Sequence, residues 1–340
     1  MKSKKVLAFS LFVFCNIIPF TSEAAFQVKD LNVFRSATLA TNTVDEHYRC
    51  GLEHIQKEEW LEARNQFYIV VSNFSNSSFA QDARYYLGIS EYYLGELDLA
   101  NLSFTEYLKC SNDPKYFVET LEYKLAIADC FKNGARKRLF GFSKLPKWSS
   151  GQSLALEIYD EIIIAAPSSN LAVSALYAKG CLLWQNREFR EAIDSLQLII
   201  RRFPKHEMTP ECYVLINKIY LDQCFQEFQN PDLLALAQIN LRRFKADFPK
   251  EPRITEAEED VQKVKEAYAR GLFDTALFYE RTAKTSAAVI YYAKTIKDYP
   301  DTYTAKMCIS RLMKLDPSAI PCQENTETEK ETTLDDALDT

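Results

Sequence analysis

Glycine and histidine are scarce in this chain of 340 residues, which has 8 glycines and 3 histidines. Glycine is used at about a third of its average frequency of roughly 7%. Neither G-x-G-x-x-G nor G-x-x-x-x-G-K-[ST] occurs, so no glycine-rich loop could cradle a nucleotide phosphate. The histidines, His47, His54 and His206, leave little material for acid–base or metal chemistry. No catalytic triad, nucleophile motif or paired-carboxylate site is recognisable, and we predict neither enzyme activity nor a cofactor.

Acidic charge is concentrated at the C-terminus. The whole chain has a formal net charge of −6, from 41 basic and 47 acidic side chains. Residues 322–340 contain seven acids against the single base Lys330, so the tail alone accounts for this net charge. The remaining chain is near neutral, which argues against a global field that steers it to nucleic acid. We expect this acidic, threonine-rich tail to be disordered.

The N-terminus has the features of an exported protein. Three lysines precede a largely apolar stretch, residues 6–20, and small residues favour cleavage after Ala24. We therefore predict that residues 1–24 are a secretory signal peptide. Two alternatives stay open. One is lipoprotein processing at Cys15, where Phe14 replaces the usual small residue. The other is a retained anchor, for which the apolar run is shorter than the roughly 18 residues required.

A helical pattern of fixed spacing repeats between residues 43 and 315. Offsets of 12, 16 and 19 residues lead from Gly51 to Ala63, Phe67 and Val70. The same offsets recur from Gly88, which lies 37 residues further along the chain. An alanine followed four positions later by a large residue then recurs in four more copies, which begin at Ala155, Ala192, Ala237 and Ala288.

Each residue type in this pattern has a packing role. Small residues let two helices approach closely, the large residue fills the groove between them, and proline ends the second helix. The pattern resembles the tetratricopeptide repeat, in which stacked neighbours bury the apolar face of each repeat. The sequence therefore predicts an all-α, right-handed superhelical solenoid of five to six helix-turn-helix repeats over residues 43–316. A long helix at residues 255–281 leads into the sixth repeat, and a helix at residues 303–315 caps the array.

A basic and aromatic insertion interrupts the third repeat at residues 132–151. It contains six basic and no acidic side chains, interleaved with leucine and aromatic residues. Such a loop could dock on anionic lipid or on an acidic partner. It could instead be a solvated insertion that folds over its own repeat. The docking residues under the first interpretation are Arg136, Lys137, Arg138 and Trp148.

Tetratricopeptide solenoids line their concave face with defined positions of the first helix, and the resemblance assigns those positions here. Position 5 is tyrosine in four repeats, and positions 9 and 12 are mostly apolar or aromatic. We predict that this face binds an extended apolar or aromatic peptide, because tyrosine offers a large contact area and a hydroxyl group. Alternatively, these tyrosines pack between helices. The predicted residues are Tyr48, Ile55, Tyr85, Ile89, Tyr92, Tyr123, Tyr177 and Trp184.

Cysteine and histidine give weaker signals. Eight cysteines remain after signal cleavage, an even number that permits disulfides in an exported chain, although no C-x-x-C occurs and no pairing can be derived. Most lie in helical patterns, where cysteine behaves as a small buried apolar residue. His47, Cys50 and His54 share one helical face and could bind a metal ion. These are also packing positions of a first helix, so we predict core contacts and no metal.

Two segments, residues 59–87 and 276–302, resemble the BamD family, the tetratricopeptide lipoprotein of the outer-membrane β-barrel assembly machine. In the second segment, Phe278-Tyr279, Ala287-Ala288 and Tyr299-Pro300-Asp301-Thr302 resemble the last repeat of that family. The resemblance implies a non-enzymatic scaffold at the periplasmic face of the outer membrane. Its partners would be the barrel-assembly protein and unfolded outer-membrane proteins. The chain departs from the family in its poor lipoprotein signal, its sixth repeat and its basic insertion.

Two other functions stay open. A Tol-Pal-associated coordinator of cell division or peptidoglycan synthesis also carries tetratricopeptide repeats, but that family has an N-terminal coiled coil. No sustained heptad pattern precedes residue 43 here. An adaptor of an export apparatus is the third interpretation. The proteins that co-purify from membranes would distinguish the three.

Overall fold

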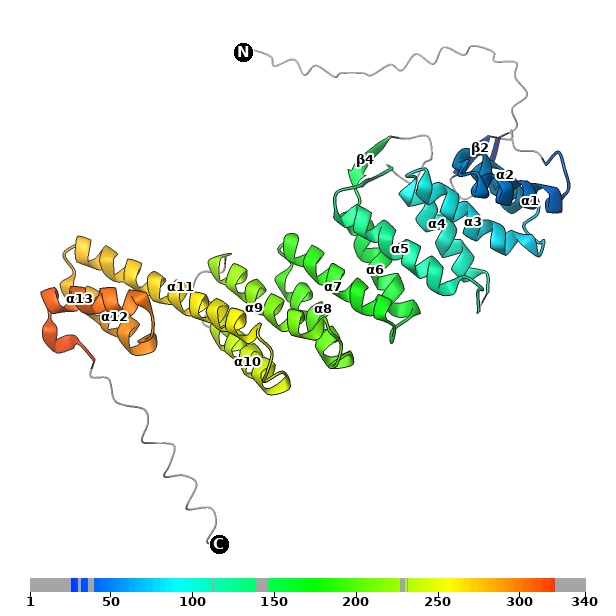
Figure 1. The fold of residues 1–340 in the computed structure, drawn as a ribbon. Helices are drawn as coiled ribbons and strands as arrows, with labels where there is room; N and C mark the ends of the chain where they lie inside the picture. The colour runs from blue at the N-terminus through cyan, green and yellow to red at the C-terminus, as the bar shows by residue number, and fades with distance from the viewer. Residues whose placement is uncertain are drawn as a thin grey trace, which may run out of the picture. The chain divides into compact units, whose positions relative to one another are not determined.

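The computed structural model describes residues 26–29, 32–35, 40–111, 113–138, 146–226, 230 and 232–321. The predicted signal peptide, the candidate lipidation site Cys15 and the acidic tail lie outside these residues. Thirteen α-helices make up most of the described chain (Figure 1). They are α1 (Val44–Gln56), α2 (Trp60–Asn73), α3 (Phe79–Tyr93), α4 (Leu97–Lys109), α5 (Phe117–Lys132), α6 (Gln152–Ala165), α7 (Asn170–Gln185), α8 (Phe189–Arg202), α9 (Thr209–Gln226), α10 (Asp232–Asp247), α11 (Ile254–Arg281), α12 (Thr285–Asp298) and α13 (Tyr303–Leu315).

The helices pair in sequence order, as the repeat predicts. Each predicted copy corresponds to one pair, from α1 with α2 to α11 with α12, and α13 packs against α12. The chain divides into two compact units, residues 1–120 with 137–149 and residues 121–136 with 150–340. An all-α array of tetratricopeptide-type repeats is confirmed.

Glycine residues allow the two helices of a pair to approach each other closely. A Cβ atom built on Gly51 would lie 2.7 Å from Cζ of Phe67, and one on Gly88 would lie 2.7 Å from Cε1 of Phe104. At Gly180 the corresponding contact, to Cγ of Leu196, is 3.1 Å. These are the glycine and large-residue positions of the sequence pattern, so the expected packing role of each is confirmed. The six repeat alanines are fully buried: Ala63, Ala100, Ala155, Ala192, Ala237 and Ala288.

The turns between paired helices use the left-handed backbone region. Gly95, between α3 and α4, has φ 72°, and glycine adopts this value without strain. In three other pairs a residue with a side chain occupies the same region, at a cost of about 1–2 kcal/mol each. These residues are Glu58 with φ 58°, Arg187 with φ 65° and Ala283 with φ 58°.

Short strands also occur, which the sequence did not predict. Strands β1 (Phe26–Lys29) and β2 (Asn32–Arg35) pair antiparallel, with Phe26 opposite Arg35. Strands β3 (Arg136–Arg138) and β4 (Lys147–Ser150) form a second two-stranded sheet within the insertion between α5 and α6. The described part of the insertion is therefore a strand pair, where we expected an irregular loop.

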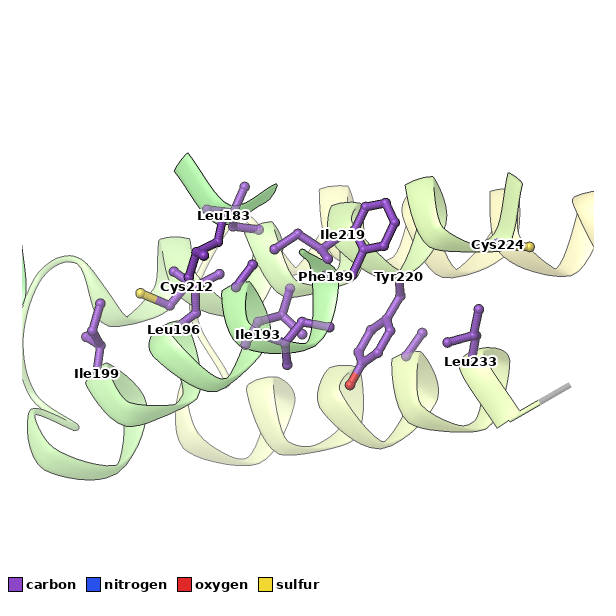
Figure 2. Close-up of a cluster of buried hydrophobic side chains, with 14 of the residues drawn as sticks. Leu183, Phe189, Ile193, Leu196, Ile199, Cys212, Ile219, Tyr220, Cys224 and Leu233 are labelled. Atoms are coloured by element: carbon purple, nitrogen blue, oxygen red, sulfur yellow. The ribbon is translucent and has the colours of Figure 1, made fainter. Parts of the chain in front are cut away.

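A large apolar cluster joins helices α7 to α11 of the second unit. Leu183 of α7, Leu196 of α8, Ile219 of α9 and Leu233 of α10 all contribute to it (Figure 2). Burial of one such side chain contributes about 1.5–3 kcal/mol. Because α7 to α11 all supply residues to the same cluster, the neighbouring repeats that they form stabilise each other.

Candidate functional site

The second unit contains an open groove at one end of α7, α8 and α9. Its cavity volume of about 520 Å³ lies within the range of roughly 300–1,000 Å³ that is typical of ligand pockets. The end of α7, the turn to α8 and the last turn of α9 form its walls. The lining residues are Cys181, Trp184, Gln185, Arg187, Phe189, Asp222, Phe225 and Gln226.

Three aromatic side chains line the groove. The Trp184 indole Nε1 donates a hydrogen bond of 2.8 Å to Oδ2 of Asp222, which links α7 to α9 and fixes the orientation of the ring. Phe189 is buried at the start of α8, where it joins the apolar cluster (Figure 2). Phe225 is 64% exposed in the last turn of α9. The groove therefore presents a fixed indole and an accessible phenyl ring to solvent.

One cation lies at the edge of this groove. Arg187 is exposed in the turn between α7 and α8 and makes no ion pair with any described residue. Asp222, the acidic residue of the lining, is engaged by the Trp184 indole. An arginine beside an aromatic pocket suits a ligand that joins an aromatic group to a carboxylate, because guanidinium groups bind carboxylates through two parallel hydrogen bonds.

Of the eight predicted concave-face residues, Trp184 lines this groove. Tyr177, two turns earlier in α7, is half-buried against the apolar cluster, and burial raises the pKa of its hydroxyl. Tyr123 of α5 is also half-buried. Burial likewise raises the pKa of the Cys181 thiol, which keeps this lining residue in its neutral form.

In the first unit the predicted tyrosines contribute mainly to the core. Tyr85 is 6% exposed and stacks on Tyr116, with ring centroids 4.3 Å apart. Ile89 is buried as well. These two residues offer no surface to a peptide, which corrects the prediction for them and supports the alternative that they pack between helices. The Tyr85 ring is covered because Tyr116, which precedes α5, stacks on it.

The other three predicted concave-face residues of the first unit are partly exposed to solvent. Tyr48 contacts the rings of Phe67 and Phe79, and burial raises its pKa to about 12. Ile55 and Tyr92 are half-buried. Their role in peptide binding stays a prediction.

The basic insertion is anchored by its charges. Arg138 is 8% exposed and forms ion pairs with Asp98, at 2.6 Å, and with Glu96. Lys147 donates to the carbonyl of Gly95 at 2.7 Å and lies 3.3 Å from Glu96. Arg138 therefore cannot be a docking residue, because carboxylates at the start of α4 already engage it.

The other predicted docking residues differ from Arg138. Trp148 is 69% exposed and Arg136 is exposed, while Lys137 is half-buried. The described residues of the insertion therefore leave one aromatic ring and one arginine accessible.

The residues weighed as metal ligands have other partners. His47 is buried with Nδ1 2.7 Å from Oε1 of Gln66, and His54 Nδ1 lies 2.6 Å from a carboxylate oxygen of Glu59. Within the described part of the chain, no cluster of His, Cys, Asp or Glu has the geometry to hold a metal ion. The seven described cysteines are free thiols.

Comparison with known proteins finds one family-model match, in the C-terminal half of the chain. Residues 168–329 match the YfiO family, outer membrane lipoproteins. This segment, 162 of the 340 residues, includes α7 to α13 and the whole groove. The match covers slightly less than half of the chain. Among the described residues, no helix combines the length and apolar character that a bilayer span requires.

Solved structures resemble the chain only distantly. A tetratricopeptide repeat protein from Parabacteroides merdae is 13% identical, with 79% of this chain and 98% of that chain covered and a TM-score of 0.35. MamA from Desulfovibrio magneticus is 16% identical, with coverage of 65% and 98% and a TM-score of 0.34. A repeat protein from Cytophaga hutchinsonii is 17% identical, with coverage of 80% and 98% and a TM-score of 0.33. No curated protein matches the chain.

Sequence reasoning missed most of the groove lining. Arg187 lies in the predicted turn between the two helices and Phe189 directly follows it, where the repeat pattern assigns no role. Phe225 stands 12 residues before Ala237, the offset at which glycine precedes alanine in the first two repeats. A phenylalanine in place of glycine was the available signal that packing changes at this point.

Proposed function

We propose that this protein is a non-enzymatic scaffold of the bacterial envelope that acts in outer-membrane β-barrel assembly. The match of residues 168–329 to a family of outer membrane lipoproteins is the observation that carries this proposal. The repeat architecture supports it, because stacked helix pairs provide extended surfaces for other proteins. The predicted partners are the barrel-assembly protein and unfolded outer-membrane proteins.

We infer that the groove at Trp184 receives the C-terminal end of an unfolded outer-membrane protein. An aromatic last residue would contact Trp184 and Phe225, and its free carboxylate would pair with Arg187. Aromatic anchors in a partly closed pocket commonly dominate the energy of protein interfaces. The arginine would add selectivity for a chain terminus over an internal segment.

Peptide titration tests this function. A peptide that ends in phenylalanine with a free carboxylate is titrated by calorimetry into the chain without residues 1–24. Phe225→Ala should weaken binding about tenfold or more, since hot-spot aromatics contribute about 2 kcal/mol or more. Amidation of the peptide terminus should weaken binding to the unaltered protein but have little further effect on Arg187→Ala.

Trp148→Ala is the matched control, because it removes an equally exposed aromatic ring from the other unit. Equal affinities of Phe225→Ala, Trp148→Ala and the unaltered chain would reject the groove as the peptide site. Co-purification from detergent-solubilised membranes tests the cellular role separately. Recovery of Pal and cell-wall enzymes without the barrel-assembly protein would reject it.

A further inference from the structure

The last helix of the array has an exposed face of mixed character. Helix α13 buries Thr304, Ala305, Cys308 and Leu312. Its opposite face exposes two apolar side chains, Tyr303 at 71% and Met313 at 62%. A surface of this kind would be covered by a further repeat if the array continued.

This face is also basic. Helix α13 contains three basic residues, Lys306, Arg311 and Lys314, and no acidic residue. Arg311 pairs with Glu280 at 3.2 Å, but Lys306 and Lys314 are exposed and make no ion pair with a described residue. At helical spacing both lysines lie on the same face as Tyr303 and Met313. The unpaired positive charge therefore flanks the exposed apolar side chains.

The acidic tail begins beside this helix. After α13 the chain forms a short 3₁₀-helix, η2 (Pro317–Ala319), which contacts α13, and Ile320 packs against the cluster that includes Leu312. Residues 322–340 follow and carry the whole net charge of the chain. The 13 residues from Cys322 to Leu334 can span up to about 45 Å. Helix α13, with 13 residues, is only about 20 Å long.

The end of the tail has a complementary pattern. Leu334, Ala337 and Leu338 have the i, i+3, i+4 spacing that is typical of one helical face, and the acids Asp335, Asp336 and Asp339 lie between and after them. Apolar groups of this segment match Tyr303 and Met313, and its carboxylates match Lys306 and Lys314. Because the tail is tethered to η2, its effective concentration at α13 is in the millimolar range.

We propose that residues 334–339 of the tail dock on the exposed face of α13 and close the C-terminal end of the repeat array. The tail then acts as an intramolecular cap, and a protein partner that stacks on α13 must displace it. The binding combines apolar contact with ion pairs, so it weakens as salt screens the charges.

Oxidation of Met313 by hydrogen peroxide, followed by mass spectrometry, measures whether the tail covers this face. The protein without residues 1–24 is compared with the same protein ending at Pro321. Met313 should oxidise about fivefold faster in the shortened protein, as expected for a docked state favoured by about 1 kcal/mol. Met208, half-buried in the α8–α9 turn, is the internal control and should not change. Equal Met313 rates in the two proteins would overturn the proposal.

Charge exchange separates this contact from other causes of protection. Lys306→Glu with Lys314→Glu should abolish the protection in the longer protein, because both side chains are exposed and the core of α13 is unaltered. Adding Asp335→Lys and Asp336→Lys to that variant should restore it. Protection that persists in the first variant would overturn the ion-pair contact. Protection that rises with protein concentration would overturn the intramolecular cap in favour of contact between two copies.

Discussion

Glu91 provides the most direct test of the energetics of the first repeats. It lies in α3, is 7% exposed and accepts a hydrogen bond of 2.7 Å from the Ser103 hydroxyl of α4. Burial is the main cause that raises the pKa of this carboxyl group from 4.5 to about 7, and the nearby acids Asp98 and Glu106 contribute in the same direction. Arg64 and the Ser103 hydrogen bond act in the opposite direction but do not offset burial.

The sign of the stability effect follows from this raised pKa. In the unfolded chain Glu91 loses its proton near pH 4.5, whereas the folded protein retains it to about pH 7. Deprotonation therefore favours the unfolded state, and stability is lost as pH rises between these two values. A difference of about 2.5 pKa units corresponds to about 3 kcal/mol, which is an upper estimate for the loss above pH 7.

Glu91→Gln should remove this dependence, because glutamine cannot ionise and its carbonyl can accept the Ser103 hydrogen bond. Urea unfolding followed by circular dichroism measures the free energy of unfolding at pH 5 and pH 8. The variant should gain about 2–3 kcal/mol relative to the unaltered protein between these two pH values. Any pH-independent effect of the amide cancels in this comparison.

Glu106→Gln is the control, because Glu106 is exposed in α4 and its removal should change stability by less than about 0.5 kcal/mol at either pH. The burial argument fails if the difference in unfolding free energy between Glu91→Gln and the unaltered protein is the same at both pH values.

Two further predictions concern packing and charge. Ala192→Leu adds a bulky side chain to a fully buried position of α8 and should destabilise the fold by about 1–3 kcal/mol. An unchanged melting curve would contradict the assigned repeat register. Arg138→Ala leaves the carboxylates of Glu96 and Asp98 without their main partner, so cleavage of the insertion by trypsin at Lys137 should become faster. Arg136→Ala serves as the control for trypsin cleavage at Lys137, because Arg136 is exposed and its removal leaves the anchor intact.

The sequence was sufficient to predict the helix pairs. Gly51, Gly88 and Gly180 reveal the close crossings because a Cβ atom would clash there or be tight, and the large residue 16 positions later fills the space. This signal is local and repeated, so each copy reinforces the others. The long helix α11 and the terminal helix α13 were predicted within one residue of their observed limits.

The groove was harder to predict because it depends on an irregular connection. Trp184 occupies an assigned repeat position, but its partner Asp222 lies 38 residues later, at the far end of an 18-residue helix. Phe225 lies in the last turn of the same helix, α9. No fixed spacing relates these residues, so only the folded arrangement of α7 and α9 brings them together.

Charge on the insertion shows a similar limit of local reasoning. Residues 132–151 contain no acid, which suggests an unneutralised basic surface. In the structure, Glu96 and Asp98 at the start of α4 neutralise Arg138, about 40 residues away in the sequence, and Lys147 pairs with Glu96 as well. The charge of a segment is therefore a poor guide to the charge of the surface it forms. By the same reasoning, Lys306 and Lys314 of α13 are a better guide to surface charge, because no described residue forms an ion pair with them. The acidic residues 322–340 follow this helix in the sequence.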